Sequence, residues 1–297
     1  MLNRVTNLTM SANAQRTLLT QQSRLAELQE KATTLTKISR PSDDPAATAK
    51  ALETRSLLAA NAQYGRNIDD GNTWLTAADS ALEQATNVMH KIKDLTVLAG
   101  NGSLPQSGKN AIADELNSLN EELVSIANSK HLGRNIFAGN SDEPKAFSGP
   151  MPPDFKGGIG LSPVDRRISA TQTVRVDAPG EVIFGSGATS VFGAVKSIAD
   201  ALNVGTAPTS PQLGNLEFRF NSIVNGRADI GTRQAQLERA GTVNTDLEAN
   251  LDAQKMGIEK LDLGSVIMDL KLQETNYQVA LAATAKVLQP TLMDFLR

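Results

Sequence analysis

The C-terminal stretch, residues 246–297, constrains the fold more than any other part of the sequence. Two series of residues at every seventh position interleave here at the 3–4 spacing that places side chains on one face of an α-helix. They are Leu263, Leu270, Tyr277, Thr284, Thr291 and Ile267, Glu274, Leu281, Leu288, Phe295. A helix over residues 246–289 is about 65 Å long at about 1.5 Å per residue. This helix is too long for the core of a compact domain, and its apolar stripe is narrow. It therefore needs a long partner helix.

Residues 1–40 supply a candidate partner. A first stripe at 3–4 spacing consists of Val5, Leu8, Ala12, Leu19 and Gln22. The stripe then shifts by one residue to Leu25, Leu28, Ala32 and Leu35. The pattern therefore predicts a second long helix with a local slip of the kind known in coiled coils.

The two ends of the chain differ in charge. Residues 1–40 contain six basic and two acidic side chains, whereas residues 246–297 contain five basic and eight acidic ones. Opposite net charges favour association of the two ends, within one chain or between chains. The same counts also fit two ordinary solvated helix faces.

Helical periodicity also covers residues 46–99 and 109–128. Asp44 followed by Pro45 is typical of a helix start, because a carboxylate caps free amide groups and proline suits the first turn. Gly65 and Gly71 lie inside the first of these helices. They indicate either a break or a close helix crossing, and the sequence leaves both open.

The composition changes near Gly139. Eight of the twelve prolines lie between Pro144 and Pro211, which excludes long helices there. Residues 167–176 and 182–184 are candidate strands, and helical periodicity returns at 191–202 and from about residue 212. The predicted fold is mainly α: a long antiparallel helical bundle or coiled-coil rod of N- and C-terminal segments (1–141 and 191–297), with a small β-rich domain (142–190) inserted.

Candidate catalytic or ligand-binding groups are sparse. The chain has no cysteine, which excludes disulfides, thiolate metal sites and cysteine nucleophiles. Neither His90 nor His131 has metal-ligand spacing, and capping explains Asp43 and Asp44 better than acid–base chemistry. The glycine clusters at 157–160 and 185–187 complete no dinucleotide or phosphate-loop pattern. The sequence therefore predicts no enzyme activity, no cofactor and no metal.

Other functional classes are also disfavoured. A net charge of −3 gives no signal for nucleic-acid binding. No run of 18 apolar residues predicts a membrane span, and the N-terminal residues show no cleavable signal peptide.

Several motifs together resemble those of flagellin-type proteins of the bacterial flagellum, and among them the hook-associated protein 3 family of hook–filament junction proteins. Arg40-Pro-Ser-Asp-Asp-Pro-Ala46 and Gly133-Arg-Asn-Ile-Phe-Ala-Gly139 resemble elements of the junction family. Residues 67–71, 99–102 and 278–296 resemble flagellins more broadly. The resemblance covers residues 1–141 and 212–297. It departs from the family pattern at Thr36, where glycine is usual, and at residues 259–262, where the acidic element is only partly kept.

The resemblance implies a secreted structural subunit, exported through the flagellar type III apparatus without a cleaved signal. Its terminal helices pack in an inner tube, as a homo-oligomer in a ring or tube. The implied partners are hook-associated protein 1, flagellin or the next junction layer, and an export chaperone, with no nucleic acid or membrane. Flagellin itself is the alternative, followed by a generic helical adaptor.

The residues expected to carry assembly lie on the terminal stripes. They are Leu18, Leu25, Leu28, Leu35, Leu263, Ile267, Leu270, Tyr277, Leu281, Leu288, Leu292 and Phe295.

Overall fold

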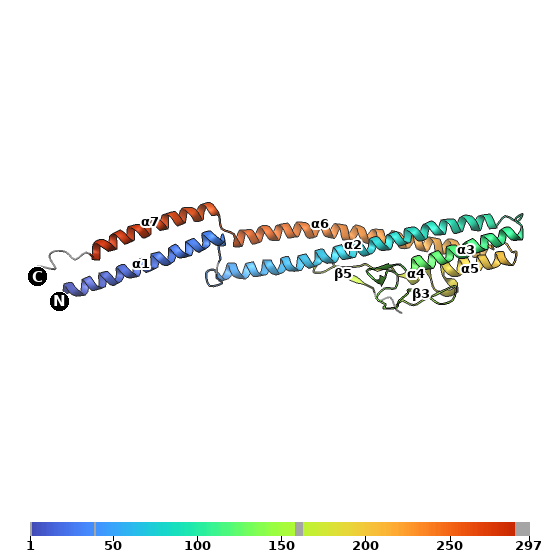
Figure 1. The fold of residues 1–297 in the computed structure, drawn as a ribbon, viewed down its shortest axis with the longest axis horizontal. Coiled ribbons are helices and arrows are strands. Elements are labelled where there is room, and N and C mark those ends of the chain that lie inside the picture. Colours follow the sequence, from blue (N-terminus) through green and yellow to red (C-terminus); the bar gives the residue numbers. More distant parts are fainter. Residues whose placement is uncertain (1, 39, 158–162, 289–297) are drawn as a thin grey trace. The chain divides into compact units, whose positions relative to one another are not determined.

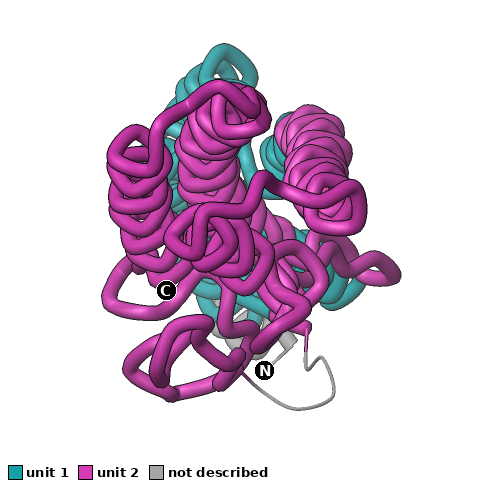
Figure 2. The backbone as a smooth tube through the Cα atoms, turned by 90° about the vertical axis from the view of Figure 1, so that its right-hand side faces the viewer, with its two compact units in different colours: residues 1–59, 248–297 teal, residues 60–247 magenta. Residues whose placement is uncertain are grey.

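A computed structural model describes residues 2–38, 40–157 and 163–288. The main helices are α1 (Leu2–Thr34), α2 (Pro45–Ala99), α3 (Gln106–Ala127), α5 (Val191–Asn203), α6 (Ser210–Glu259) and α7 (Leu263–Leu288) (Figure 1). The predicted mainly helical architecture is confirmed. The chain forms two compact units, residues 1–59 with 248–297 and residues 60–247, which are coloured separately in Figure 2. Within the described residues, no helix is both long and apolar enough to cross a membrane.

In the first unit, α1 and α7 lie side by side and antiparallel (Figure 1). Gln273 Nε2 donates to Gln21 Oε1 at 2.5 Å, which fixes the register of the pair. Within residues 11–32 of α1 the half-buried positions follow one heptad pattern, with Ala12 and Lys31 half-buried beside it: Ser11, Ala14, Leu18, Gln21, Leu25, Leu28 and Ala32. The side chains of Val5 and Leu8 lie outside the described residues, and over residues 11–32 the predicted slip is wrong. Leu18 and Leu19 are adjacent and both apolar, and the structure turns Leu18 inward while Leu19 is 65% exposed.

The predicted continuous helix over 246–289 is interrupted at residues 260–262, between α6 and α7. Asp262 starts α7: its Oδ1 accepts from Gly264 N at 3.1 Å, and its carbonyl accepts from Val266 N at 3.1 Å. On the other side of the break, Leu261 N donates to Leu35 O at 3.1 Å. The pairing with the segment after α1 thus provides hydrogen bonds for backbone N–H and C=O groups at the break. In a continuous helix these groups would be bonded within the helix.

In the second unit, α2 and α6 run antiparallel and exchange polar contacts along their length. The buried Asn61 donates from Nδ2 to Asn244 O at 2.9 Å, and Asn244 Nδ2 donates to Asn61 Oδ1 at 2.8 Å. Further along, Arg227 Nε lies 2.8 Å from Asp79 Oδ1. A buried amide pair of this kind fixes helix register, because any shift leaves it unpaired.

Gly65 and Gly71 do not break α2, which is continuous. At both positions, side chains from other parts of the chain approach the α2 backbone closely. A Cβ on Gly65 would lie 3.1 Å from Asn244 Oδ1, and a Cβ on Gly71 would lie 3.0 Å from Val176 and 3.1 Å from Leu237. The close-crossing interpretation therefore holds for both glycines.

The core of the second unit combines a heptad stripe of α2 with α3, α5 and a cluster of phenylalanines. The α2 stripe includes Ile68, Leu75, Leu82 and Met89, all buried. The rings of Phe147 and Phe192 lie 5.2 Å apart, and those of Phe137 and Phe184 lie 5.1 Å apart. Because Phe147 and Phe184 come from the predicted insert and the other two from outside it, residues 142–190 share their core with the helices. The division into 1–141, 142–190 and 191–297 stays a prediction.

In the described residues, the β strands form three two-stranded antiparallel hairpins, and Thr36 and Lys260 form an isolated bridge besides. Their strands are β1 (Lys130–His131) with β2 (Arg134–Asn135), β3 (Phe147–Ser148) with β4 (Asp154–Phe155), and β5 (Asp165–Arg167) with β6 (Thr173–Arg175). In the last hairpin Arg166 pairs with Val174. The predicted strand over 167–176 is therefore confirmed only at Thr173–Arg175, because a turn in which Ile168 N donates to Gln172 O separates these residues from Arg167, the last residue of β5.

The predicted strand at 182–184 is wrong. These residues belong to the short helix α4 (Gly180–Phe184), where Ile183 N donates to Pro179 O at 3.1 Å. The adjacent residues Ile183 and Phe184 are both buried. A strand would point them to opposite faces, whereas a helical turn buries both.

Candidate assembly surface

The seam between α1 and α7 partly covers five of the residues predicted to carry assembly. Leu18, Leu25 and Leu28 on α1, and Leu270 and Tyr277 on α7, are half-buried. Polar or small residues share this seam, among them Gln21 and Gln273. The α1–α7 seam therefore buries fewer large apolar side chains than the core stripe of α2 does. Much of the surface of α7 stays exposed.

Three further predicted residues of α7 lie beside the seam. Leu263 is 50% exposed, Ile267 47% and Leu281 44%. The predicted heptad series that begins at Ile267 is displaced by one residue. The positions turned towards α1 are Val266, Gln273 and Ala280. Their exposure leaves Leu263, Ile267 and Leu281 free for contacts outside the subunit.

The remaining predicted residues are placed differently. Leu35 follows the last residue of α1, has a positive φ of 53°, and is 40% exposed, so it does not continue the α1 stripe. Leu288 ends α7, but its side chain lies outside the described residues. Leu292 and Phe295 also lie outside them.

Sequence reasoning missed a second apolar stripe on α7. Met268 is 74% exposed, Leu272 61% and Val279 63%. At about 100° per residue they fall on the side of the helix roughly opposite Leu270 and Tyr277. We call Met268, Leu272 and Val279 the outer stripe. The low number of charged residues in α7 could have predicted this second stripe. A helix with apolar residues on two sides is expected to pack against partners on both sides.

The exposed face of α1 is different in character. Apart from Met10 and Leu19, its exposed described positions are alanine or polar residues such as Arg16 and Arg24. Among the side chains that the structure describes, exposed large apolar residues are thus concentrated on α7 rather than on α1. An exposed apolar stripe such as the outer stripe of α7 marks a candidate interaction site.

The Pro-Ser-Asp-Asp-Pro motif forms the turn between α1 and α2. Asp43 Oδ2 accepts from Arg40 N at 2.9 Å, and Asp44 Oδ1 accepts from Ala47 N at 2.9 Å. The second bond caps the start of α2, as the sequence predicted. Between this turn and α1 lies a polar hollow of about 310 Å³. It is lined by Ser23, Ala26, Glu27, Glu30, Arg40 and Asp43.

The second motif, residues 133–139, serves the core. Leu132 and Gly133 form the tip of the β1–β2 hairpin, both with positive φ. Ile136, Phe137 and Ala138 follow and are buried. The motif therefore connects α3 to the phenylalanine cluster and presents no reactive group.

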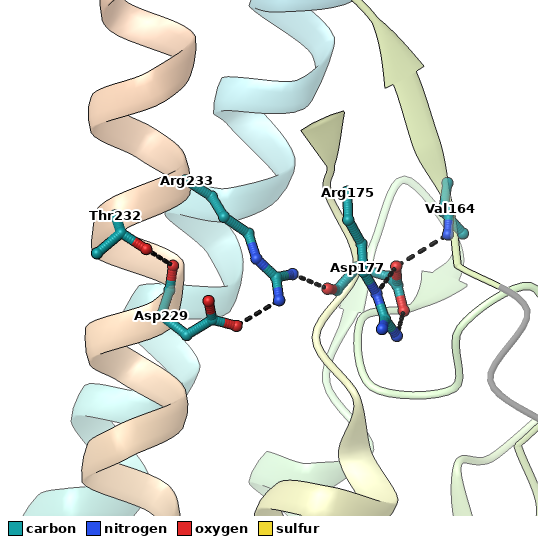
Figure 3. Close-up of polar contacts among 6 residues, drawn as sticks. All are labelled: Val164, Arg175, Asp177, Asp229, Thr232 and Arg233. Atoms are coloured by element: carbon teal, nitrogen blue, oxygen red, sulfur yellow. Dashed lines mark hydrogen bonds and ion pairs between the residues drawn. The ribbon is translucent and has the colours of Figure 1, made fainter. Parts of the chain in front are cut away.

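A buried carboxylate connects the β5–β6 hairpin to α6 (Figure 3). Asp177 is fully buried; its Oδ1 accepts from Arg175 Nε at 2.8 Å and from Val164 N at 2.9 Å, and its Oδ2 accepts from Arg175 Nη2 at 2.7 Å. From α6, Arg233 Nη1 donates to the Asp177 carbonyl at 2.9 Å and also pairs with Asp229. The hydrogen bonds to Asp177 raise the pKa of Arg175. We call this group the Asp177 clasp; its acceptors are all used within the protein.

The two histidines make ring contacts. His90 meets Phe220 with ring centroids 5.0 Å apart, and His131 meets Trp74 at 5.4 Å. In the part of the chain that the structure describes, no group of three or more histidine, aspartate or glutamate side chains could hold a metal ion. The expectations of no cofactor and no enzyme activity stay predictions.

Comparison with known proteins finds that the chain is similar to flagellar proteins. Residues 5–142 match the family described as the bacterial flagellin N-terminal helical region. The flagellar hook-associated protein 3 of Salmonella typhimurium is 24% identical over 86% of this chain and 87% of its own length. The resemblance inferred from the motifs is thus confirmed.

Two further relatives bear on the function and the fold. A flagellar filament 30.7 kDa core protein of Treponema maltophilum is 25% identical over 86% of both chains. The crystal structure of the flagellar junction protein FlgL from Legionella pneumophila superposes with a TM-score of 0.58 at 15% identity, covering 71% of this chain and 99% of that one. At this identity the second likeness supports the fold alone.

Proposed function

We propose that this chain is a structural subunit of the bacterial flagellum that forms the junction between hook and filament, a protein of the hook-associated protein 3 kind. The observation that carries the proposal is the match to that protein along nearly the whole of both chains. The junction-type motifs at residues 40–46 and 133–139 support it, because they form the α1–α2 turn and a core segment of this fold.

Assembly follows from the unequal surfaces of the terminal helices. The outer stripe lies on one side of α7, and the exposed residues Leu263, Ile267 and Leu281 lie on the other side, next to the seam with α1. We propose that α7 of a neighbouring copy, or of the adjacent junction layer, covers the outer stripe and that copies form a ring or tube. Burying a leucine is worth about 2 kcal/mol, so several such contacts per copy hold a subunit in place.

The remaining partners follow from the same assignment. The junction subunit contacts hook-associated protein 1 on the hook side and flagellin or the next junction layer on the filament side. Before assembly an export chaperone binds it, and the flagellar type III apparatus exports it without a cleaved signal. Its place of action is the extracellular flagellum.

A filament subunit is the second candidate, because the Treponema filament core protein matches over a similar length. Immunogold labelling of isolated flagella separates the two. The junction role predicts one narrow band at the distal end of the hook. Label along the whole filament would assign the chain to the filament, and absence of label from flagella would leave the generic helical adaptor.

A further inference from the structure

The two helix breaks of the first unit meet and pair. The segment after α1 and the segment between α6 and α7 run antiparallel over residues 35–37 and 259–261, with Thr36 opposite Lys260. Lys37 N donates to Glu259 O at 2.7 Å, and Leu261 N donates to Leu35 O at 3.1 Å. We call this pair of segments the backbone bridge.

The bridge holds a backbone conformation that is unfavourable in isolation. Leu35 has a φ of 53°, a region that costs a non-glycine residue of order 1–2 kcal/mol. Hydrogen bonds hold it on both sides, since Leu35 N donates to Lys31 O at 2.8 Å and its carbonyl accepts from Leu261. A strained residue that carries two backbone bonds is kept in place by the pairing.

Side chains anchor the same place to α2. Arg55 Nε lies 2.7 Å from Glu259 Oε1, and the Glu259 side chain is only 19% exposed. The bridge thus joins the end of α1, the end of α6 and the first part of α2. Beyond the bridge, residues 2–34 and 263–288 of the described chain form α1 and α7.

The pairing of α1 with α7 needs such a starting point. Their seam contains Ser11, Ala14, Gln21 and Gln273 in positions where a stable coiled coil has large apolar residues. Helix formation has an unfavourable nucleus, and bringing together segments far apart in the sequence costs loop entropy. Once the bridge has formed, each further contact along the seam closes only a short loop.

We propose that the backbone bridge between residues 35–37 and 259–261 nucleates the pairing of α1 with α7, so that the two terminal helices order from the bridge towards the chain ends. This inference concerns the isolated subunit and does not depend on the assignment to the junction. It gives Leu35 a role in the bridge in place of the predicted role in the α1 stripe.

Hydrogen exchange on the full-length monomer, read by mass spectrometry, tests the proposal with two variants. Lys37→Pro removes the N–H that bonds Glu259, whereas Lys37→Ala removes the same side chain and keeps that N–H. We expect amides of α1 and α7 to exchange about tenfold faster in the proline variant than in the alanine variant. Amides of residues 60–247 should be unchanged in both.

The double variant Thr36→Cys/Lys260→Cys closes the bridge covalently. In an antiparallel pair that does not exchange hydrogen bonds, Cα atoms lie about 4.5 Å apart, within the span of a disulfide. The chain has no other cysteine, so only this bond forms. Oxidation should slow exchange in both helices, most strongly near Thr34 and Leu263 and least towards the chain ends.

Two results would overturn the proposal. One is equal exchange in the proline and alanine variants together with no effect of oxidation. The other is protection that is strongest at the chain ends and weakest beside the bridge. If both helices exchange freely in the unmodified monomer, the oxidised double variant still tests the proposal. Slower exchange in the oxidised than in the reduced protein would support nucleation at the bridge, and equal exchange would contradict it.

Discussion

Replacing Leu272 with aspartate is expected to abolish assembly while leaving the isolated subunit folded. Leu272 is 61% exposed in the subunit, so the carboxylate stays hydrated there. In an assembly that covers the outer stripe it is buried without a partner, which costs several kcal/mol, and about 2 kcal/mol of leucine burial is lost as well. A loss of this size weakens each contact by about a thousandfold or more.

The measurements are the circular dichroism of the purified variant and the motility of cells that carry it. Leu281→Asp tests the opposite side of α7, next to the seam with α1, where Leu281 is 44% exposed; it too should impair assembly and leave the subunit folded. The matched control is Lys271→Asp, because Lys271 is exposed and only pairs with Glu274 at 2.8 Å. Normal motility of both leucine variants would show that neither side of α7 is covered in the assembly, and an unfolded Leu272→Asp monomer would show that the outer stripe belongs to the subunit's own core.

The second large effect is expected at the Asp177 clasp. Asp177→Ala leaves Val164 N without its acceptor and leaves Arg175, whose side chain is 26% exposed, without its partner. Breaking a buried pair on one side costs about 3–5 kcal/mol. For a unit of this size, each kcal/mol lowers the midpoint of thermal unfolding by about 2–4 °C, so a decrease on the order of 10 °C is expected.

Urea unfolding followed by circular dichroism measures the change in free energy. Asp177→Asn should lower the free energy of unfolding by less than Asp177→Ala, because its amide oxygen can still accept from Val164 N. The exposed ion pair of Lys196 with Asp200, 3.0 Å apart, is the matched control, since Asp200→Ala should cost less than about 1 kcal/mol. A cost of Asp177→Ala as small as that of the control would mean that the clasp does not hold the hairpin on α6.

The long helices could be predicted because heptad spacing over many turns has no other explanation. The faces of the terminal helices could not. Leu18 and Leu19 are adjacent and equally apolar, so only the partner helix decides which turns inward. On α7, apolar residues stand on two sides, and the spacing alone does not select Val266 over Ile267 for the seam.

Other differences have tertiary causes. The break at residues 260–262 contains no proline or glycine, and it depends on pairing with Leu35 from the far end of the chain. Gly65 and Gly71 would weaken an isolated helix, but Asn244 and Leu237 need the space they leave. The apolar run at 182–184 is too short for its periodicity to separate strand from helix.

The outer stripe of α7 is the surface on which the assembly account depends, and cysteine footprinting at position 272 tests it most directly. Leu272→Cys introduces the only thiol of the chain, and its rate of reaction with a maleimide can be compared in the free subunit, in isolated flagella and after the flagella are dissociated by heat. If assembly covers the outer stripe, the thiol should react fast in the subunit, at least tenfold more slowly in flagella, and fast again after dissociation. A thiol that reacts equally fast in intact flagella and in the free subunit would contradict assembly through the outer stripe.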